Sequence, residues 1–386
     1  MIDGRANGRN GSEGDTGRWY GTIARRPRWA SARRDAAHYA DATARIQPMT
    51  EDPPLPVTRP APVVSILTPT YNHERFIAQC IQSAIDQTDR RWEQFVVDDG
   101  STDATGSIVE SYADERLHYI RMPHRGILHL AESYNLALER ATGEFVAVLE
   151  GDDFWPPDKI ERQIRLFEDP DIVLNFGLAH ITDEAGAFLF TVPSARVAAR
   201  ANGRARGPTL RALLESNFIS AGAVMCRRDA LLRVGGFHQP EGVSTADYPT
   251  WLQLLRVGRF SSTVENLGYQ RNHPTQVTQR LKDAIDRTQE YGPAFVESLS
   301  PAEREELGIT VDDALRILER RRAYLSYEAA RAALVAGDRR AAKRGFRAAA
   351  RHGSTPTRLK GAIGLLAAYL GLDFETIAAV AKRVPR

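Results

Sequence analysis

Three carboxylates stand together in the stretch Glu150-Gly151-Asp152-Asp153, directly after the apolar run at 145–149. Neighbouring acids repel one another and ionise poorly together unless a proton or a cation relieves the repulsion. Hard divalent cations prefer carboxylate oxygens, and a glycine between the acids allows the backbone to approach closely. The stretch therefore predicts a metal site that would hold a diphosphate. The alternative is a solvated turn that caps the following helix.

A second acidic pair, Asp98-Asp99, follows the apolar run at 95–97 and precedes a Gly-Ser turn. The pair either shapes a turn before a helix that Ser101 or Asp103 caps, or presents a carboxylate to a ligand. A carboxylate only accepts hydrogen bonds, so it suits a planar N–H such as that of uracil or thymine, while Tyr71 offers an aromatic face for stacking. This pattern indicates a nucleobase site that favours uracil or thymine over guanine.

The residues around these acids predict alternating strands and helices. The run at 63–69 is continuously apolar, and the next segment has apolar residues at helical spacing: Ile77, Cys80, Ile81, Ala84 and Ile85. The same order of strand and helix recurs three more times, which predicts an α/β fold with a mostly parallel sheet covered by helices. Ligands of such sheets bind beyond the carboxyl ends of the strands, where residues 69–71, 98–99 and 150–153 fall.

The composition is that of an ordinary globular protein, with 386 residues, 42% hydrophobic and 26% charged, and a net charge of +2. Such a small net charge gives no indication of a nucleic-acid partner. The two cysteines, Cys80 and Cys226, form no CxxC pattern, which argues against a disulfide framework or a structural zinc site. The sequence has no apolar run long enough to span a bilayer and no apolar signal segment, so we expect a cytoplasmic protein.

The texture of the sequence predicts three parts. Residues 1–60 resemble a flexible leader that ends in a Pro-rich linker, residues 61–280 form the α/β domain, and residues 281–386 form a helical C-terminal region. In the last part we expect two helices joined near Gly337-Asp338, followed by the apolar stretch 362–372. That stretch is too short to cross a bilayer, so we expect these helices to pack against the core or to self-associate. Attachment to an anionic membrane is the alternative.

Four stretches together resemble the inverting GT-A glycosyltransferases of family 2, which use nucleotide-sugar donors: VSILTPTYNHERFIAQCIQSAIDQT, FVVDDGSTDAT, NLALERATGEFVAVLEGDD and VGGFH. The resemblance implies a Rossmann-like GT-A nucleotide-sugar-binding domain. It implies that Pro69 and Tyr71, together with the pair Asp98-Asp99, cradle the nucleoside of the donor. Glu150-Gly151-Asp152 takes the place of the family's Asp-x-Asp motif, which coordinates Mn²⁺ or Mg²⁺ and touches the ribose or the sugar.

The resemblance also assigns roles further along the chain. Asp247 corresponds to the catalytic base in the family's Glu-Asp pair, whereas Ala246 stands where the Glu is usual; a helix N-cap is the alternative for Asp247. His273 corresponds to a further metal or phosphate ligand of many GT-A enzymes, with a lone surface histidine as the alternative. Because Glu150 replaces the usual Asp and lengthens that arm by one methylene, Asp152 is the better candidate for direct metal coordination.

Gly235, Gly236 and Phe237 resemble the family segment on the acceptor side, although core packing also explains Phe237. The stretch 181–211 is expected to include an acceptor loop. The implied function is metal-dependent, inverting transfer of a sugar from a nucleoside-diphosphate donor, with UDP or dTDP favoured, to a hydroxyl of a saccharide, lipid-linked or protein acceptor. The expected setting is bacterial surface polysaccharide or glycoconjugate assembly, in the cytoplasm or at the inner face of the membrane.

Other classes of protein leave different patterns. A non-catalytic nucleotide-sugar-binding or scaffold protein is the alternative that Ala246 and Glu150 motivate. A nucleotidyltransferase should carry a glycine-rich phosphate loop after its first strand, and the stretch LTPTYNHERF has no glycine. The GxGxxG of dinucleotide-binding proteins is missing after the first strand, and the chain has no GxxxxGK[ST] of P-loop proteins, so both classes are set aside.

Overall fold

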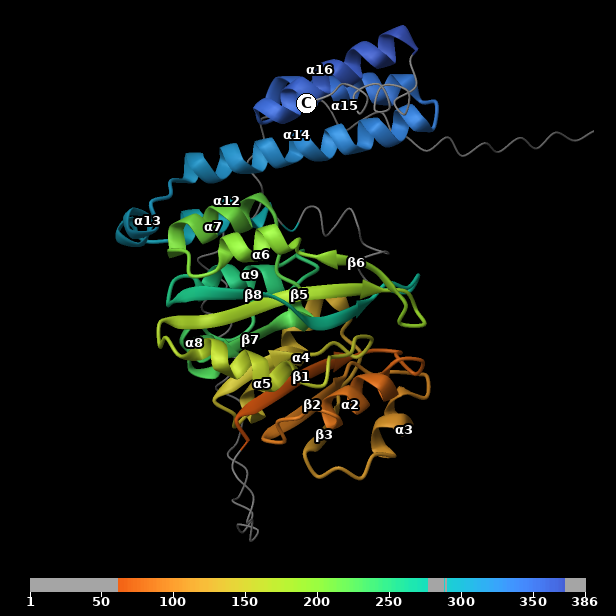
Figure 1. The fold of residues 1–386 in the computed structure, drawn as a ribbon, viewed down its shortest axis with the longest axis vertical. Coiled ribbons are helices and arrows are strands. Elements are labelled where there is room, and N and C mark those ends of the chain that lie inside the picture. The colour runs from red at the N-terminus through yellow and green to blue at the C-terminus, as the bar shows by residue number, and fades with distance from the viewer. Residues whose placement is uncertain (1–61, 277–287, 289, 372–386) are drawn as a thin grey trace, which may run out of the picture. The chain divides into compact units, whose positions relative to one another are not determined.

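A computed structural model describes residues 62–276, 288 and 290–371 (Figure 1). In this part of the chain eight strands form one sheet, with the order β3-β2-β1-β4-β7-β5-β6 and β8 paired to β5. The strands are β1 (Val64–Thr70), β2 (Trp92–Asp98), β3 (Leu117–Arg121), β4 (Phe145–Val148), β5 (Ile172–Thr182), β6 (Phe188–Val192), β7 (Val224–Arg227) and β8 (Arg259–Arg271). The predicted leader at residues 1–60 lies outside the described residues.

Helices connect and cover these strands. They are α2 (Ile77–Ile85), α3 (Thr105–Glu110), α4 (Leu130–Arg140), α5 (Lys159–Ile164), α6 (Ala195–Ala201), α7 (Arg206–Glu215), α8 (Arg228–Arg233), α9 (Asp247–Leu254), α12 (Tyr291–Ser298), α13 (Pro301–Leu307), α14 (Val311–Val335), α15 (Arg339–His352) and α16 (Thr355–Leu370). Three short 3₁₀ turns lie at Ile127–His129, Arg165–Phe167 and Ala221–Ala223.

The predicted α/β fold with a mostly parallel sheet is confirmed. Strands β1 to β4 pair in parallel, as four successive strand–helix units require, and β8 pairs in parallel with β5. Strand β7, however, runs antiparallel between β4 and β5, and β6 runs antiparallel to β5 at the edge. The sheet is therefore mixed, a feature that the sequence did not predict.

The central strands β1, β2 and β4 are buried on both faces, because they have apolar residues at consecutive positions. In β1, Leu67 packs on the side of α4 and α9, whereas Ile66 packs on the side of α2, α3 and α5. Val148 and Ala147 of β4 divide in the same way. Alternation of side chains across a strand produces these two cores, and Ile81 of α2 lies fully buried in the second one.

The predicted caps of α3 are wrong in part. The helix begins at Thr105 after Ala104, with no side-chain cap hydrogen bond. The Ser101 hydroxyl instead accepts a hydrogen bond from the Asn72 backbone N–H at 2.9 Å. Asp103 does bind the Thr105 N–H, at 3.0 Å. The Asn72–Ser101 hydrogen bond fastens the loop after β1 to the loop after β2, and so it holds together the two strand ends that were expected to bind a ligand.

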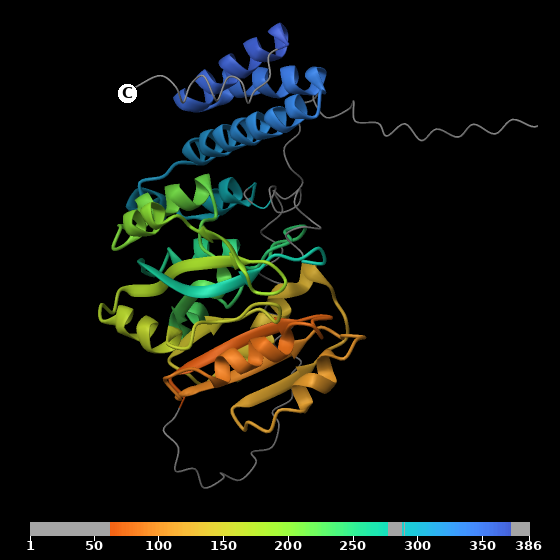
Figure 2. The same cartoon turned by 45° about the vertical axis from the view of Figure 1, so that its right-hand side comes forward.

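The C-terminal helices belong to two different cores. Phe295 of α12, Leu307 of α13 and Ile317 near the start of α14 lie in the same core as the sheet. From Tyr327 onward, α14 packs with α15 and α16 in a separate cluster around Phe346, and the three helices lie side by side in both views (Figures 1 and 2). The predicted break between two helices is confirmed at 336–338, while the predicted domain limit at residue 280 falls outside the described residues.

The stretch 181–211, expected to include an acceptor loop, contains the β5–β6 hairpin and the helix α6. The hairpin turn is fastened by Asp183, whose Oδ1 accepts hydrogen bonds from the backbone N–H groups of Ala185 and Ala187. Thr182, at the end of β5, accepts a hydrogen bond through its carbonyl from the Asn272 N–H at 2.8 Å. The hairpin therefore ends beside the residues that follow β8.

Candidate functional site

The three polar clusters predicted at strand ends converge around β1. Strand β1 lies between β2 and β4. Backbone hydrogen bonds to both neighbours continue beyond the last paired residues of these strands. The Gly151 N–H donates to the Pro69 carbonyl at 3.1 Å, and the Asp99 N–H donates to the Thr70 carbonyl at 2.9 Å. The acid loop at 150–153 and the Asp98-Asp99 turn therefore flank the end of β1, as the sequence predicts.

Gly151 brings the acid loop against the first strand end. A Cβ atom at this position would lie 2.4 Å from Thr70 Oγ1 and 2.8 Å from His73 Nδ1, so any larger residue would push the loop away. Because Gly151 has no side chain, Asp152 can approach His73, which stands three residues after the strand end.

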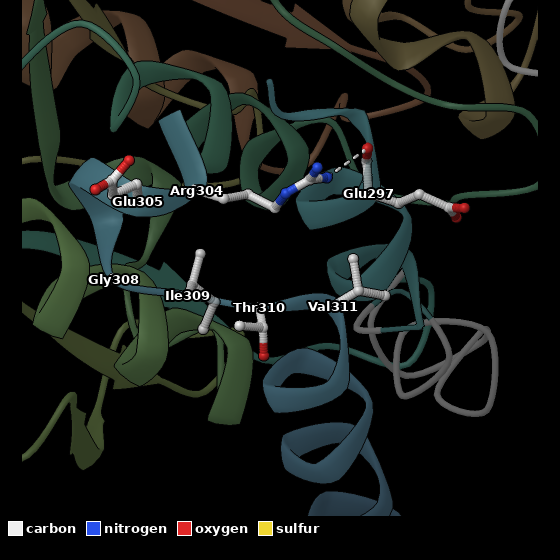
Figure 3. Close-up of a pocket in the computed structure, with 7 residues that line it drawn as sticks. All are labelled: Glu297, Arg304, Glu305, Gly308, Ile309, Thr310 and Val311. Carbon is white, nitrogen blue, oxygen red and sulfur yellow. Dashed lines mark hydrogen bonds between the residues drawn. The ribbon is translucent and has the colours of Figure 1, made fainter. Parts of the chain in front are cut away.

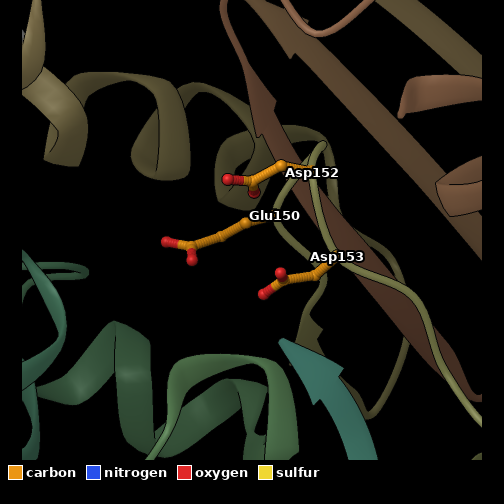
Figure 4. A group of neighbouring side chains, drawn as sticks. All are labelled: Glu150, Asp152 and Asp153. Carbon is orange, nitrogen blue, oxygen red and sulfur yellow. The ribbon is translucent and has the colours of Figure 1, made fainter. Parts of the chain in front are cut away.

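The acid cluster consists of Glu150, Asp152 and Asp153. One oxygen of each carboxylate lies within 4.8 Å of the others, and Figure 4 shows the three side chains projecting from one loop toward a common space. Asp152 and Asp153 are buried, and Glu150 is partly exposed. This is a set of hard oxygen donors at a spacing that suits a divalent cation.

The three acids of the cluster differ in the direction in which their pKa values are shifted. Burial raises the pKa of Glu150 to about 8, with repulsion from Asp152 as the second cause. Burial, Asp152 and Glu150 raise the pKa of Asp153 well above its usual value. Burial also opposes ionisation of Asp152, but His73 and His273 outweigh it, so the pKa of Asp152 is lowered. Asp152 is therefore the acid that ionises most readily, and a cation would displace the proton that Glu150 retains at neutral pH.

Two histidines flank Asp152. His273 places Nε2 at 3.0 Å from Asp152 Oδ2, and its Nδ1 lies 2.9 Å from the Thr275 hydroxyl. His73 places Nε2 at 4.0 Å from the same Asp152 oxygen, and burial lowers the pKa of His73. His273 is thus next to the acid that is the best metal candidate, and it is buried rather than a lone surface histidine.

Arg271, the last residue of β8, holds the acid loop from the other side. Its backbone N–H donates to Asp153 Oδ1 at 2.9 Å, and its guanidinium donates to the Asp152 carbonyl at 2.6 Å and to Gln79. The guanidinium lies over the rings of Phe76 and Phe154. A buried arginine paired in this way fixes the loop and offsets part of its negative charge.

Glu150 is oriented by an aromatic stack that leads into the core. The Tyr134 hydroxyl on α4 donates to Glu150 Oε1 at 3.0 Å. The Tyr134 ring stacks on Phe237, with centroids 4.6 Å apart, and Phe237 is only 2% exposed. This burial argues against the expected contact between Phe237 and an acceptor, because the side chain is covered by Tyr134 and Trp251. Phe237 supports Glu150 from behind.

Gly235 and Gly236 make the turn before Phe237, and both have a φ of +86°. A Cβ on Gly236 would lie 2.4 Å from Asn135 Oδ1, the atom that accepts the Phe237 N–H at 2.7 Å. The glycines therefore allow α4 and this turn to meet closely, in a backbone conformation that L-residues with side chains seldom adopt.

The nucleobase candidates have different surroundings. Asp98 is fully buried, and its oxygens accept hydrogen bonds from the Ser101 N–H at 2.7 Å and the Tyr119 hydroxyl at 2.6 Å, which argues against direct contact with a donor. Asp99 accepts the N–H groups of residues 125 and 126 at 2.7 and 2.8 Å. Tyr71 is 38% exposed and stacks one face on His124, with centroids 4.2 Å apart.

Asp247 is the first residue of α9, which starts without a side-chain cap hydrogen bond, so the capping alternative is not what the structure shows. The Asp247 carboxylate accepts a hydrogen bond from Asn217 at 2.8 Å, and burial raises the pKa of Asp247. Repulsion from Asp247 also contributes to the raised pKa of Glu150, which places Asp247 near the acid cluster. Ala246, where the resemblance expects an acid, is buried in the core.

The sequence of the chain is similar to those of known proteins. A family model for glycosyl transferase family 2 matches residues 65–235. TuaG of Bacillus subtilis, a glycosyltransferase named for teichuronic acid biosynthesis, is 32% identical over 199 residues, which cover 51% of this chain and 73% of TuaG. The chain belongs to glycosyl transferase family 2. This family 2 glycosyltransferase therefore acts on a nucleotide-sugar donor, as the resemblance implied.

Further comparisons concern the sequence and the fold. An uncharacterized glycosyltransferase of Rickettsia typhi is 27% identical over 246 residues, which cover 63% of this chain and 74% of that protein. The crystal structure of residues 1–349 of S. aureus TarS in complex with UDP-GlcNAc aligns with a TM-score of 0.53 over 80% of this chain and 92% of that one. Its identity is 16%, so it shows the GT-A fold alone.

Several residues of this family 2 glycosyltransferase that surround the acid cluster were not predicted from the sequence. They are His73, Tyr134, Asn217 and Arg271. His73 follows the end of the first strand closely enough to have been a candidate, because side chains at strand ends of such sheets face the ligand edge. The other three carry no local signal, since a tyrosine on a helix, an asparagine in a loop and an arginine in a strand are all common.

A separate pocket lies where α12, α13 and α14 meet (Figure 3). Arg304 crosses it and donates a hydrogen bond to the Glu297 carbonyl at 3.2 Å. The remaining lining residues are Glu305, Gly308, Ile309, Thr310 and Val311. None of these lining residues stands at a strand end, so the pocket has no part in the acid cluster.

No helix in the described residues combines the length and the apolarity that crossing a bilayer requires.

Proposed function

We propose that this family 2 glycosyltransferase is metal-dependent and inverting, and that it moves a sugar from a UDP- or dTDP-linked donor to an acceptor hydroxyl. The acid cluster in the loop after β4 is the observation that carries the proposal. Two acids whose pKa values are raised by burial face an ionised Asp152. Such an arrangement is relieved by a cation that replaces the protons, and hard oxygen ligands favour Mn²⁺ or Mg²⁺.

Asp152 would bind the metal directly, with His273 and Glu150 as further ligands. His273 Nε2 already points at Asp152 Oδ2, so both atoms converge on one position. Arg271 and Tyr134 hold the loop and the Glu150 arm in place. The bound metal would supply Lewis-acid stabilisation of the charge that develops on the departing nucleoside diphosphate.

The nucleoside would lie between Tyr71 and Asp99. Tyr71 has an exposed face, and Asp99 binds two backbone N–H groups. Asp99 Oδ2 also lies 2.9 Å from His124 Nδ1. A carboxylate has about four acceptor positions, so Asp99 keeps one for the ring N–H of uracil or thymine. Pro69 contributes backbone, since its carbonyl ties the acid loop to the strand end. Asp98 shapes the turn that presents Asp99.

Asp247 would act as the general base. Its carboxylate is oriented by Asn217, and its raised pKa makes it a stronger proton acceptor than an exposed aspartate. In the reaction, the acceptor oxygen forms a bond to the anomeric carbon while the bond to the diphosphate oxygen breaks, and Asp247 takes the hydroxyl proton. Attack from the side opposite the leaving group inverts the anomeric configuration.

We place the acceptor on the side of Gly235 and Gly236. A saccharide, lipid-linked or protein acceptor fits the proposal, and the similarity to TuaG supports bacterial surface polysaccharide or glycoconjugate assembly.

A non-catalytic nucleotide-sugar-binding protein is the alternative that the buried Ala246 motivates, because this position adds no acid to the site. Metal-dependent release of nucleoside diphosphate from a panel of nucleotide sugars would distinguish an enzyme from a binding protein.

The substitution Asp247→Asn tests the base. Asparagine keeps the size of the side chain but cannot accept the proton, so kcat should fall by about a hundredfold to ten-thousandfold while donor affinity and Tm stay unchanged. The matched control is Asp229→Asn, because Asp229 also lies in the first turn of a helix, α8. A variant Asp247→Asn that keeps more than about a tenth of kcat rules out this role.

A further inference from the structure

Helix α16 packs through its small residues. Gly361, Gly364, Ala367 and Ala368 are buried, and they face α15 and α14. A Cβ on Gly364 would lie 2.5 Å from the ring of Phe346 on α15, so only glycine allows this approach. This close contact occupies one side of α16, and most of the large side chains of the helix lie on the other side.

The opposite side of α16 is an exposed apolar stripe, whose residues recur at three- and four-residue spacing. Its members are Leu359 (64% exposed), Ile363 (44%), Leu366 (59%), Tyr369 (57%) and Leu370 (63%). Side chains at such spacing lie along one face of a helix. Five adjacent large apolar groups form a continuous patch, and such patches mark contact with a partner or a membrane.

A row of cations borders the stripe. The segment from Arg339 to Gly371 contains eight lysines and arginines and no aspartate or glutamate, in a chain with a net charge of +2. Lys343 on α15 lies over the ring of Tyr369 at 4.1 Å, and Arg347 donates to the Tyr369 hydroxyl at 3.0 Å. Lys343 and Arg347 of α15 therefore lie next to the apolar stripe of α16.

We propose that α15 and α16 bind the surface of an anionic membrane, with the stripe of α16 in the interface and the cations of α15 at the headgroups. Basic residues beside an apolar helix face are the usual features of helices that lie in a membrane plane. With sixteen residues, α16 is about 24 Å long, too short to span the hydrocarbon core. A second copy would bring two sets of cations together, which opposes self-association through this face.

Vesicle binding of the full chain tests the electrostatic part. We expect cosedimentation with phosphatidylcholine vesicles that contain phosphatidylglycerol, release at high salt, and little binding to pure phosphatidylcholine. The triple variant Arg340→Gln, Arg344→Gln, Arg351→Gln should bind about a hundredfold more weakly, at about fivefold for each charge removed. The matched control removes three exposed arginines of the catalytic core: Arg140, Arg165 and Arg233. Equal loss in both triple variants would show a mere net-charge effect and overturn the proposal.

The double variant Leu359→Gln, Leu366→Gln tests the apolar part, since glutamine keeps the helix but removes apolar contact. Its vesicle affinity should fall about tenfold or more. The control Leu232→Gln, Val264→Gln, at core sites that are about half exposed, should match the wild type. Unchanged Tm would show that the helices remain folded. Absence of phosphatidylglycerol-dependent binding, or a dimer that the double variant dissociates without changing vesicle binding, would contradict the proposal and favour a second copy on this face.

Discussion

Replacing Glu150 with glutamine tests whether the acid cluster exchanges protons for a cation. Because the pKa of Glu150 is raised to about 8, most molecules keep this carboxyl protonated at neutral pH. A cation that uses Glu150 must displace the proton, so its apparent affinity rises with pH up to the pKa. The competent fraction grows from about a thirtieth at about pH 6.5 to about a half at about pH 8, which predicts a rise in affinity of about fifteenfold.

The stability of the metal-free protein depends on pH in the opposite direction to the metal affinity. Without a metal, the folded state binds a proton that the unfolded chain has already released above the usual pKa of a glutamate. The stability that comes from this proton is present at low pH and is lost as the pH rises through about 8. Metal affinity and metal-free stability should therefore change in opposite directions over the same pH interval.

Calorimetric titration with Mg²⁺ in two buffers of different ionisation enthalpy measures both the affinity and the protons released. In the wild type we expect at least one proton per metal, because Asp153 also has a raised pKa and adds to the release. In Glu150→Gln the release should fall by about one proton and the rise with pH should flatten. The control Glu144→Gln removes an exposed acid. A flat profile in the wild type, or an identical profile in Glu150→Gln, would refute the reasoning.

Two further predictions concern the metal and the turn before Phe237. The substitution Asp152→Ala should abolish Mn²⁺- or Mg²⁺-dependent turnover and weaken nucleoside diphosphate binding, and unchanged metal and nucleotide affinities in calorimetry would contradict its role. The substitution Gly236→Ala should lower the free energy of unfolding by about 3 kcal/mol, since it adds a clash with Asn135 to the cost of a positive φ. Its neighbour Gly235→Ala has the same φ and an open surrounding, so denaturant titration should show a loss of only about 1 kcal/mol there.

The order of the first four strands and their helices could be predicted because it depends on local signals. Apolar runs and helical spacing mark each element, and a parallel arrangement follows from the helices between the strands. The antiparallel place of β7 could not be predicted, since nothing in a strand of four residues specifies which strand it pairs with. The helices α12 and α13 likewise belong to the main core through long-range packing of Phe295 and Leu307.

The candidate site shows the same division. The sequence located the pair Asp98-Asp99. It could not show that the Asp98 side chain is buried, whereas the Asp99 carboxylate binds the backbone N–H groups of residues 125 and 126. Phe237 was expected near an acceptor, and the structure places it behind Tyr134. Whether an acid or an aromatic residue faces a ligand depends on which helix covers it, and that information lies in residues far away in the chain.

The pairing of Asp152 with His273 has a consequence for how the protein folds. These two side chains are 121 residues apart in the chain, and the pairing of β8 with β5 brings them together. Contacts of such high sequence separation form late, because the loops between them must close first. Competence to bind a cation should therefore appear in the last kinetic phase of refolding, after most helical signal has returned. Metal binding during refolding would report the moment at which the final strand takes its place.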